Sequence, residues 1–110
     1  MKIAEFEKRV GLSRDTLRYY EKKGLISPPK RDANGYRYYD EIQRQELAFI
    51  NKGKTIGFTL KEIKLGYQRY KALGHLCPEF VKQLKNKKIQ LAKQIKADQL
   101  AIKEIEAMLK

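Results

Sequence analysis

The first two dozen residues place apolar and polar positions with the period of a helix. Ile3, Phe6 and Val10 fall on one helical face, and a glycine follows where a left-handed terminating residue is expected. A second helix is predicted over residues 13–23, because its leading serine can accept a hydrogen bond from a free first-turn N–H and a glycine follows its end. Two short helices joined by a three-residue turn are typical of a helix-turn-helix.

Turn and strand signals follow the second helix. Pro28 and Pro29 forbid helix, and Asn34-Gly35 separates two short runs, the second of which is aromatic. The pattern predicts a small protruding hairpin from which Arg37 reaches outward. One or more of three tyrosines should anchor the hairpin on the core: Tyr36, Tyr38 and Tyr39.

Two capping boxes predict two more helices. Asp40 with Gln43 begins one helix, and Thr59 with Glu62 begins the next, since in each pair the side chains can exchange hydrogen bonds with first-turn N–H groups. The intervening segment 54–58, KTIGF, is interpreted as a turn after a frayed helix end.

The last third predicts a single long helix. Pro78 suits a first helical position, and no glycine or proline follows it. At alternating steps of three and four residues, seven of nine positions are apolar, which indicates a coiled-coil seam whose partner is a second copy of the chain. A long helix folded back on its own domain is the alternative. The apolar seam positions are Val81, Leu84, Leu91, Ile95, Ile102, Ile105 and Leu109.

The predicted fold class is therefore mostly α, with residues 1–74 as one compact domain and 75–110 as a dimerisation helix.

Composition adds a strong positive charge: 25 Lys and Arg against 13 Asp and Glu give +12. A surface this basic favours a polyanionic partner, either nucleic acid or an anionic membrane, over a merely solvated face. No apolar run approaches the roughly 20 residues that span a bilayer, and no signal peptide or disulfide framework is visible, so we expect a cytoplasmic protein without a membrane partner.

The adjacent tyrosines of the second helix divide its two faces. Neighbours in sequence point about 100° apart on a helix, so Tyr19 and Tyr20 cannot share a face. Tyr20 packs inward with Leu17 in this prediction, while Tyr19 lies beside a basic stripe of Arg14, Arg18 and Lys22. A phenol can donate to a phosphate oxygen and arginine can bond guanine in the major groove, so the helix has the chemistry to read DNA.

These segments together resemble the MerR family of bacterial transcription regulators over residues 1 to about 70. The resemblance is carried by the blocks TLRYYEKKGLI, NGYRYYD and IGFTLKEI. It implies a winged helix-turn-helix domain and an antiparallel two-helix coiled coil between subunits. It also implies a homodimer that binds a pseudo-palindromic operator in double-stranded DNA, and bends and untwists it so that RNA polymerase can use the promoter.

The same resemblance implies the residues that contact DNA. The recognition helix would supply four of them, the wing two, and a second wing before the fourth helix two lysines. In order, these residues are Arg14, Thr16, Arg18, Tyr19, Arg37, Tyr38, Lys52 and Lys54.

Two positions depart from the family pattern. Arg44 stands where an aliphatic residue is usual, and Gly53 costs the third helix about 1 kcal/mol relative to alanine. Either the helix face is rotated, with Ile42 filling the gap, or the second wing is looser than usual.

Few residues are candidates for sensing a signal or for catalysis. Relatives carry an effector region after the coiled coil, whereas here we expect none, so the dimer itself would read any signal. Cys77, before the long helix, is a candidate thiol or electrophile sensor, because a positive helix end lowers a thiol pKa. An inert, half-buried cysteine is the alternative, and one His and one Cys are too few for a metal site in one chain. No catalytic constellation or cofactor motif is visible, so no enzyme is expected.

Two other functions fit parts of this pattern. The first is an architectural or recombination-accessory protein that bends DNA without acting on transcription. The second is a small RNA-associated protein, which the two-fold seam argues against, because paired recognition helices suit half-sites about one turn apart on duplex DNA.

Overall fold

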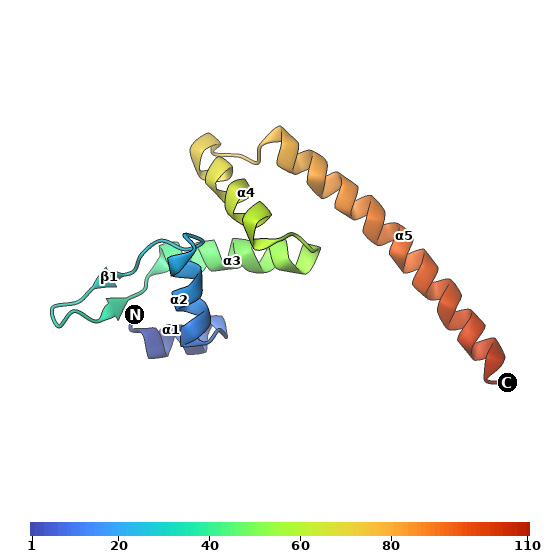
Figure 1. Ribbon diagram of the computed structural model, residues 1–110, viewed down its shortest axis with the longest axis horizontal. Helices are drawn as coiled ribbons and strands as arrows, with labels where there is room; N and C mark the ends of the chain where they lie inside the picture. The colour runs from blue at the N-terminus through green and yellow to red at the C-terminus, as the bar shows by residue number, and fades with distance from the viewer.

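The computed structural model describes all 110 residues. Helices α1–α4 and a two-stranded hairpin form a compact body, and α5 extends away from it (Figure 1), so that the molecule measures 67 × 37 × 19 Å. This is the mostly helical winged architecture that the sequence predicts. The elements are α1 (Ile3–Val10), α2 (Arg14–Lys22), β1 (Lys30–Arg31), β2 (Arg37–Tyr38), α3 (Glu41–Ile56), α4 (Leu60–Leu73) and α5 (Pro78–Met108).

Local capping signals set the helix boundaries as predicted. The Ser13 side chain accepts a hydrogen bond from the Thr16 N–H at 3.2 Å and begins α2. Both capping boxes are formed, at the start of α3 and at the start of α4. Gly11 adopts φ +69° after α1, a conformation that a side chain would strain. Short-range chemistry therefore accounts for where α2, α3 and α4 begin and for where α1 ends.

One hydrophobic cluster joins the helices to the hairpin. Phe6 of α1 stacks on Tyr39 with ring centroids 4.6 Å apart, and both side chains are fully buried. Burial of aromatic rings of this size is the largest favourable term that a small domain has. The cluster's buried members are Phe6, Leu17, Tyr20, Leu25, Ile26, Tyr39, Leu47, Ile50, Phe58, Ile63, Cys77 and Phe80.

A polar contact fixes the segment after α2 against α3. The buried Glu46 carboxylate accepts hydrogen bonds from the Ser27 N–H and the Ser27 hydroxyl, each at 2.8 Å. Gln43, also buried, donates to the Ser27 carbonyl at 3.2 Å. Since these charged and polar groups are paired, their burial is tolerated and orients the chain that leads into the hairpin.

The predicted turn at 54–58 is wrong in its first half. Helix α3 continues through Ile56 and ends at Gly57, which has φ +103°. The helix persists because Gly53 lies directly on α4: a Cβ at this position would be 2.6 Å from Cγ1 of Ile63. The glycine therefore allows α3 and α4 to approach closely, and packing outweighs its poor helix propensity.

Arg44, the other departure from the family pattern, lies on the surface of α3. Arg44 is exposed and pairs with Glu41 at 3.4 Å across one helical turn. Ile42 is 41% exposed and does not fill a gap in the core. The α3 face is thus oriented by Gln43, Leu47 and Ile50, which point inward.

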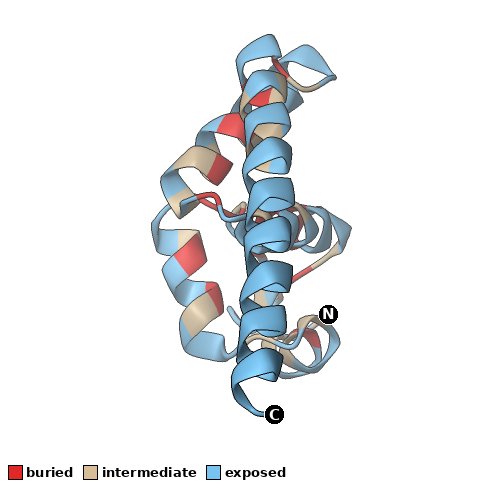
Figure 2. Ribbon diagram, turned by 90° about the vertical axis from the view of Figure 1, so that its right-hand side faces the viewer, coloured by how far each residue is buried: buried red, intermediate tan, exposed pale blue.

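The first turns of α5 pack on the body and the remainder does not. Phe80 stacks on Phe58 at a centroid distance of 5.2 Å, and it covers Gly66, where a Cβ would be 2.7 Å from its ring. From Lys88 onward every residue is exposed, as the continuous pale blue of α5 shows (Figure 2). The long helix itself is confirmed. None of the helices combines the length and the apolar character needed to cross a bilayer.

Candidate nucleic-acid interface

Helix α2 presents a buried face and a basic face. Leu17 and Tyr20 lie in the core, with Tyr20 only 4% exposed. Tyr19, its neighbour, is 47% exposed, and Arg18 is exposed beside it. The predicted division between a core tyrosine and a surface tyrosine is confirmed. We call the exposed set the recognition face: Arg14, Arg18, Tyr19 and Lys22.

Contacts within the chain hold the first turn of α2. The Thr16 hydroxyl lies 2.9 Å from the Ser13 Oγ and is half-buried, so its hydroxyl is already hydrogen-bonded. Arg14 Nε donates to Glu7 of α1 at 2.9 Å. Arg18 has no ion-pair partner, which leaves its guanidinium available for an anion or a base edge.

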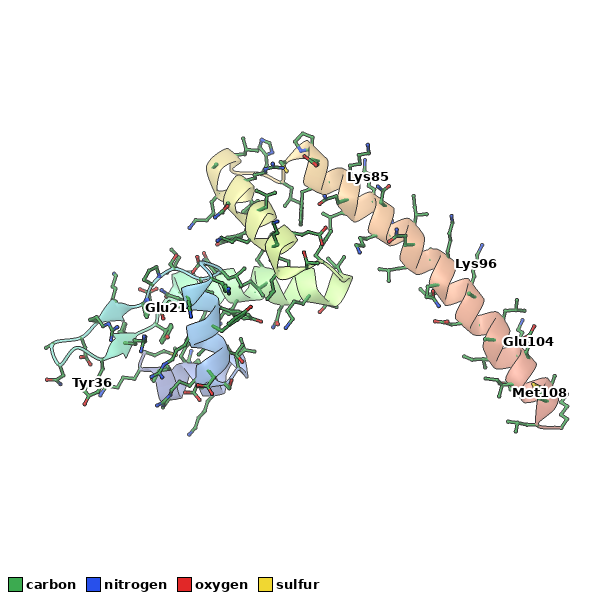
Figure 3. All side chains as sticks on the ribbon, in the orientation of Figure 1. Glu21, Tyr36, Lys85, Lys96, Glu104 and Met108 are labelled. Atoms are coloured by element: carbon green, nitrogen blue, oxygen red, sulfur yellow. The ribbon has the colours of Figure 1, made fainter.

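The hairpin lies against α2 and the N-terminus of the chain, because Arg37 meets Glu21 of α2 and Tyr38 forms a β-bridge with Lys2. Strands β1 and β2 are antiparallel, with Arg31 opposite Arg37. The Asp32 carboxylate accepts the N–H groups of Asn34 at 2.9 Å and Tyr36 at 3.0 Å, which shapes the loop. Tyr36 is 65% exposed at the tip (Figure 3). This small ribbon is the predicted wing.

Arg37 does not reach outward as predicted. Its Nε lies 3.4 Å from Oε2 of Glu21 on α2, and the side chain is 26% exposed. Successive strand residues point to opposite sides, so Arg37 shares the inward side with Tyr39 and leaves Tyr38 outside at 45% exposure. Glu21 turns Arg37 inward, and the sequence gives no local sign of this pairing. The anchoring tyrosine is Tyr39.

A cleft of about 420 Å³ lies between the wing and the first two helices. Its charged lining is entirely cationic, with Lys2 and Arg31 adding to three arginines already predicted. We call it the wing cleft, lined in its charged part by Lys2, Arg14, Arg18, Arg31 and Arg37. Lys2 and Arg31 are not among the residues predicted from the sequence, although the position of Arg31 next to the predicted turn could have indicated it.

A second basic cleft, of about 330 Å³, lies on the other side of the recognition face. Tyr19 forms one wall, with Lys23 Nζ 5.8 Å above its ring centroid. The N-terminal turn of α4 forms the other wall and contributes Lys61 and Lys64. We call this the α4 cleft. Its lysines follow the predicted Thr59 cap, where a helix N-terminus already favours anions, and the analysis missed them.

The two predicted second-wing lysines lie on a helix and not in a turn. Lys52 and Lys54 both fall within α3, because that helix runs to Ile56. Lys54 Nζ lies 3.4 Å from the Tyr20 hydroxyl, so it is tied to the body. Lys52 is exposed. Their contact with DNA stays a prediction.

Cys77 precedes α5 and is 6% exposed. The backbone N–H of Phe80 at the positive end of α5 lowers the pKa of its thiol, and the Arg69 guanidinium lowers it further. Nowhere in the chain do three or more His, Cys, Asp or Glu side chains gather as a metal-binding group. A sensing role for this thiol stays a prediction.

Residues 1–68 match the family described as MerR HTH family regulatory protein. The chain belongs to the MerR family. Over 62 residues it is 40% identical to the HTH-type transcriptional regulator CueR of Salmonella typhi, covering 56% of this chain and 45% of that protein. The chain thus spans about half the length of several curated relatives that it matches.

Solved MerR-family structures share the whole arrangement, long helix included. The N-terminal part of MtaN, the Bacillus subtilis multidrug transporter activator, superposes with a TM-score of 0.67 at 27% identity, covering 99% of this chain and 97% of that one. HiNmlR, described as a MerR family regulator lacking the sensor domain and bound to promoter DNA, gives 0.71 at 26% identity and covers 93% and 77%.

Proposed function

We propose that this MerR-family chain is a transcription regulator that binds a pseudo-palindromic operator in promoter DNA as a homodimer and distorts it. The observation that carries the proposal is the recognition face of α2 between two basic clefts. A helix on which Arg18 and Tyr19 are exposed and Arg18 is unpaired, with a basic cleft on each side, has the chemistry that a major-groove reader requires.

The contacts divide by chemistry. Arg18 and Tyr19 would reach base edges or the adjacent backbone, because both are exposed on α2 and Arg18 is unpaired. The wing cleft and the α4 cleft would each hold a stretch of phosphate backbone. Arg37 would act on phosphate from its Glu21-paired position, so its part is electrostatic rather than base-specific.

The homodimer is supported by α5. Its exposed apolar seam needs a partner, and two copies related by a two-fold axis would present two α2 helices to half-sites a helical turn apart. Two recognition faces held at fixed separation would act on the DNA between them, so deformation of the site would contribute to selectivity. RNA polymerase at the same promoter would then be the functional partner.

The first experiment is a titration of the protein onto the promoter duplex beside its own gene and onto scrambled DNA of equal length, at two salt concentrations. Charge attraction alone weakens steeply with salt for both duplexes alike. We expect the promoter duplex to keep an advantage of about a thousandfold or more at the higher salt. Equal binding to both duplexes would end the regulator proposal for that site.

Single alanine variants assign the contacts. Arg18→Ala should reduce the advantage of the promoter duplex about tenfold or more, since one good bidentate base contact contributes about 1–3 kcal/mol. Lys96→Ala removes one positive charge from α5, far from α2 (Figure 3), and should leave the advantage unchanged. If both variants lose the same small amount of affinity for both duplexes, Arg18 contributes only charge.

A reporter separates regulation from architecture. Expression from the cognate promoter should change when the protein is supplied, and Arg18→Ala should abolish the change. Tight, selective binding and bending with no change in expression would favour the architectural or recombination-accessory alternative.

A further inference from the structure

The seam of α5 consists of nine positions from Val81 to Leu109, and most of it has no cover within the chain. Beyond Leu84 the apolar seam side chains are between 49% and 80% exposed. Contiguous apolar surface of this extent marks an interaction site. The exposed members are Leu91, Ile95, Ile102, Ile105 and Leu109.

Two seam positions carry opposite charges. Lys88 and Asp98 interrupt the apolar row, and neither has an ion-pair partner in the chain. Asp98 only accepts a hydrogen bond from Gln94 one turn earlier, at 2.8 Å. A charge enclosed in a coiled-coil interface costs stability unless it meets an opposite charge, so both residues require a partner from outside the chain.

These signs agree with the antiparallel direction that the family resemblance implies. In a parallel, in-register pair each seam residue faces its own copy, which would bring lysine against lysine and aspartate against aspartate. In an antiparallel pair, a residue early in one seam faces a residue late in the other. Lys88 and Asp98 can then face each other, and the two-fold axis makes the contact occur twice.

We propose that Lys88 and Asp98 of two antiparallel copies form a reciprocal pair of interfacial ion pairs that fixes the register of the coiled coil. All the remaining layers between Val81 and Ile105 are then apolar on both sides. The layers pair Leu91 with Ile95 of the partner subunit, Leu84 with Ile102 of the partner subunit, and Val81 with Ile105 of the partner subunit.

The competing registers are excluded by the same two charges. A shift of one heptad in either direction keeps the seams in contact, but it sets Lys88 against an isoleucine or leucine of the partner subunit. Asp98 would then face Ile95 or Val81 of the partner subunit. Each shift leaves four unpaired charges in the interface of the dimer, whereas the proposed register leaves none.

This inference rests on the homodimer of the proposed function and on the antiparallel direction that the family resemblance implies, and it adds the register and the residues that fix it. Charge reversal tests it, with the dimer dissociation constant measured by sedimentation. Lys88→Asp and Asp98→Lys should each weaken dimerisation about tenfold or more, since each replaces two attractive contacts by repulsive ones. The double variant restores two opposite-charge pairs and should return to within about threefold of the original value.

Matched reversals on the other side of α5 control for general charge effects. Lys96→Asp and Glu104→Lys make the same changes about 130° or more from the seam centre, at roughly 100° per residue; both residues are marked in Figure 3. They should leave dimerisation unchanged. A double seam variant as weak as either single variant would overturn the register while leaving the dimer intact; a monomeric unmodified protein would overturn the dimer as well.

Cysteine cross-linking tests the direction independently of affinity. In a Cys77→Ser background, the double variant Lys88→Cys with Asp98→Cys should form a covalent dimer on oxidation, and either single variant should remain uncoupled. Ten residues span about 15 Å along one helix, so the two cysteines cannot bond within a chain. Cross-linking of a single-cysteine variant to its own copy would demonstrate a parallel pair and contradict the proposal.

Discussion

At the scale of single residues, the environments of neighbouring side chains in the wing depend on two things: the alternating direction of side chains along a strand, and the ion pair with Glu21 on α2. Three consecutive residues lie in three different environments: Arg37 pairs with Glu21, Tyr38 is exposed, and Tyr39 is fully buried against Phe6. The Tyr39 hydroxyl is buried without a hydrogen-bond partner. Burial and, next, the Glu21 carboxylate raise the pKa of this phenol, so it stays neutral.

The first prediction concerns that orphaned hydroxyl. Tyr39→Phe should leave the free energy of unfolding unchanged or raise it by up to about 1 kcal/mol, because the ring stays and an unsatisfied group is removed. Tyr39→Ala should lower it by about 3–5 kcal/mol, because the stacked ring is lost. Urea unfolding of both variants measures this. A loss above about 1 kcal/mol in the phenylalanine variant would mean that the hydroxyl has a partner.

The second prediction concerns the Cys77 thiol. Since the Phe80 N–H and then Arg69 lower its pKa, the thiolate should form at a lower pH than in an unfolded chain, as followed by ultraviolet absorbance against Cys77→Ser. Arg69→Gln should move the titration upward. The sign also fixes stability: the thiolate stabilises the fold above the ordinary thiol pKa, and this contribution disappears as the pH falls through the folded value. An unshifted titration would contradict the geometry.

At the scale of elements, the contact between α3 and α4 depends on a residue that helix propensity disfavours. Gly53 allows the Ile63 side chain to lie where a Cβ would otherwise be, and Gly66 does the same for Phe80. Both glycines are buried inside helices. Close packing between the elements thus overrides the local preference of each.

The third prediction follows from that contact. Gly53→Ala should lower the free energy of unfolding by about 1–3 kcal/mol through overpacking, although alanine favours helix. Asn51→Ala, at an exposed position of the same helix, isolates propensity and should change stability by no more than about 0.5 kcal/mol. Thermal or urea unfolding compares the two. A stabilised Gly53→Ala variant would show that Ile63 can move aside at little cost.

At the scale of the whole molecule, the first turns of α5 pack on the body, and the rest is the surface that we propose pairs with a second copy. Phe80 closes the core over Gly66, and Lys87 Nζ lies 5.6 Å above the centroid of the Phe58 ring. Past these contacts the helix is exposed along its length. The contacts of Phe80 and Lys87 with the body are therefore what hold the start of α5 in place.

The fourth prediction separates these two parts by truncation. A chain of residues 1–90 keeps Phe80 and lacks most of the seam, so it should fold as a monomer. A chain of residues 1–76 loses Phe80 and should be less stable than 1–90 by about 3–5 kcal/mol. Sedimentation and urea unfolding measure both. Equal stability of the two truncated chains would place Phe80 outside the folding unit.

Features that short-range chemistry controls could be predicted from the sequence alone. The caps at Ser13, Asp40 and Thr59 set the starts of three helices. The 3.6-residue period placed Tyr19 and Tyr20 on different faces of α2, and the apolar seam predicted the long helix α5. Each depends on residues within one or two turns of each other, whose geometry is the same in any fold. The family resemblance added the expected role of the hairpin as a wing and the expected DNA contacts, which stay predictions.

The other features depend on contacts between segments that are distant in the sequence. Arg37 turns inward because Glu21, sixteen residues earlier, lies across from it, and α3 outlasts its predicted end because Gly53 meets Ile63 on α4. The wing cleft and the α4 cleft collect lysines and arginines from separate elements, so no local pattern contains them. Contacts between distant segments depend on how whole elements pack, and a local pattern cannot encode the distance between two side chains on different elements.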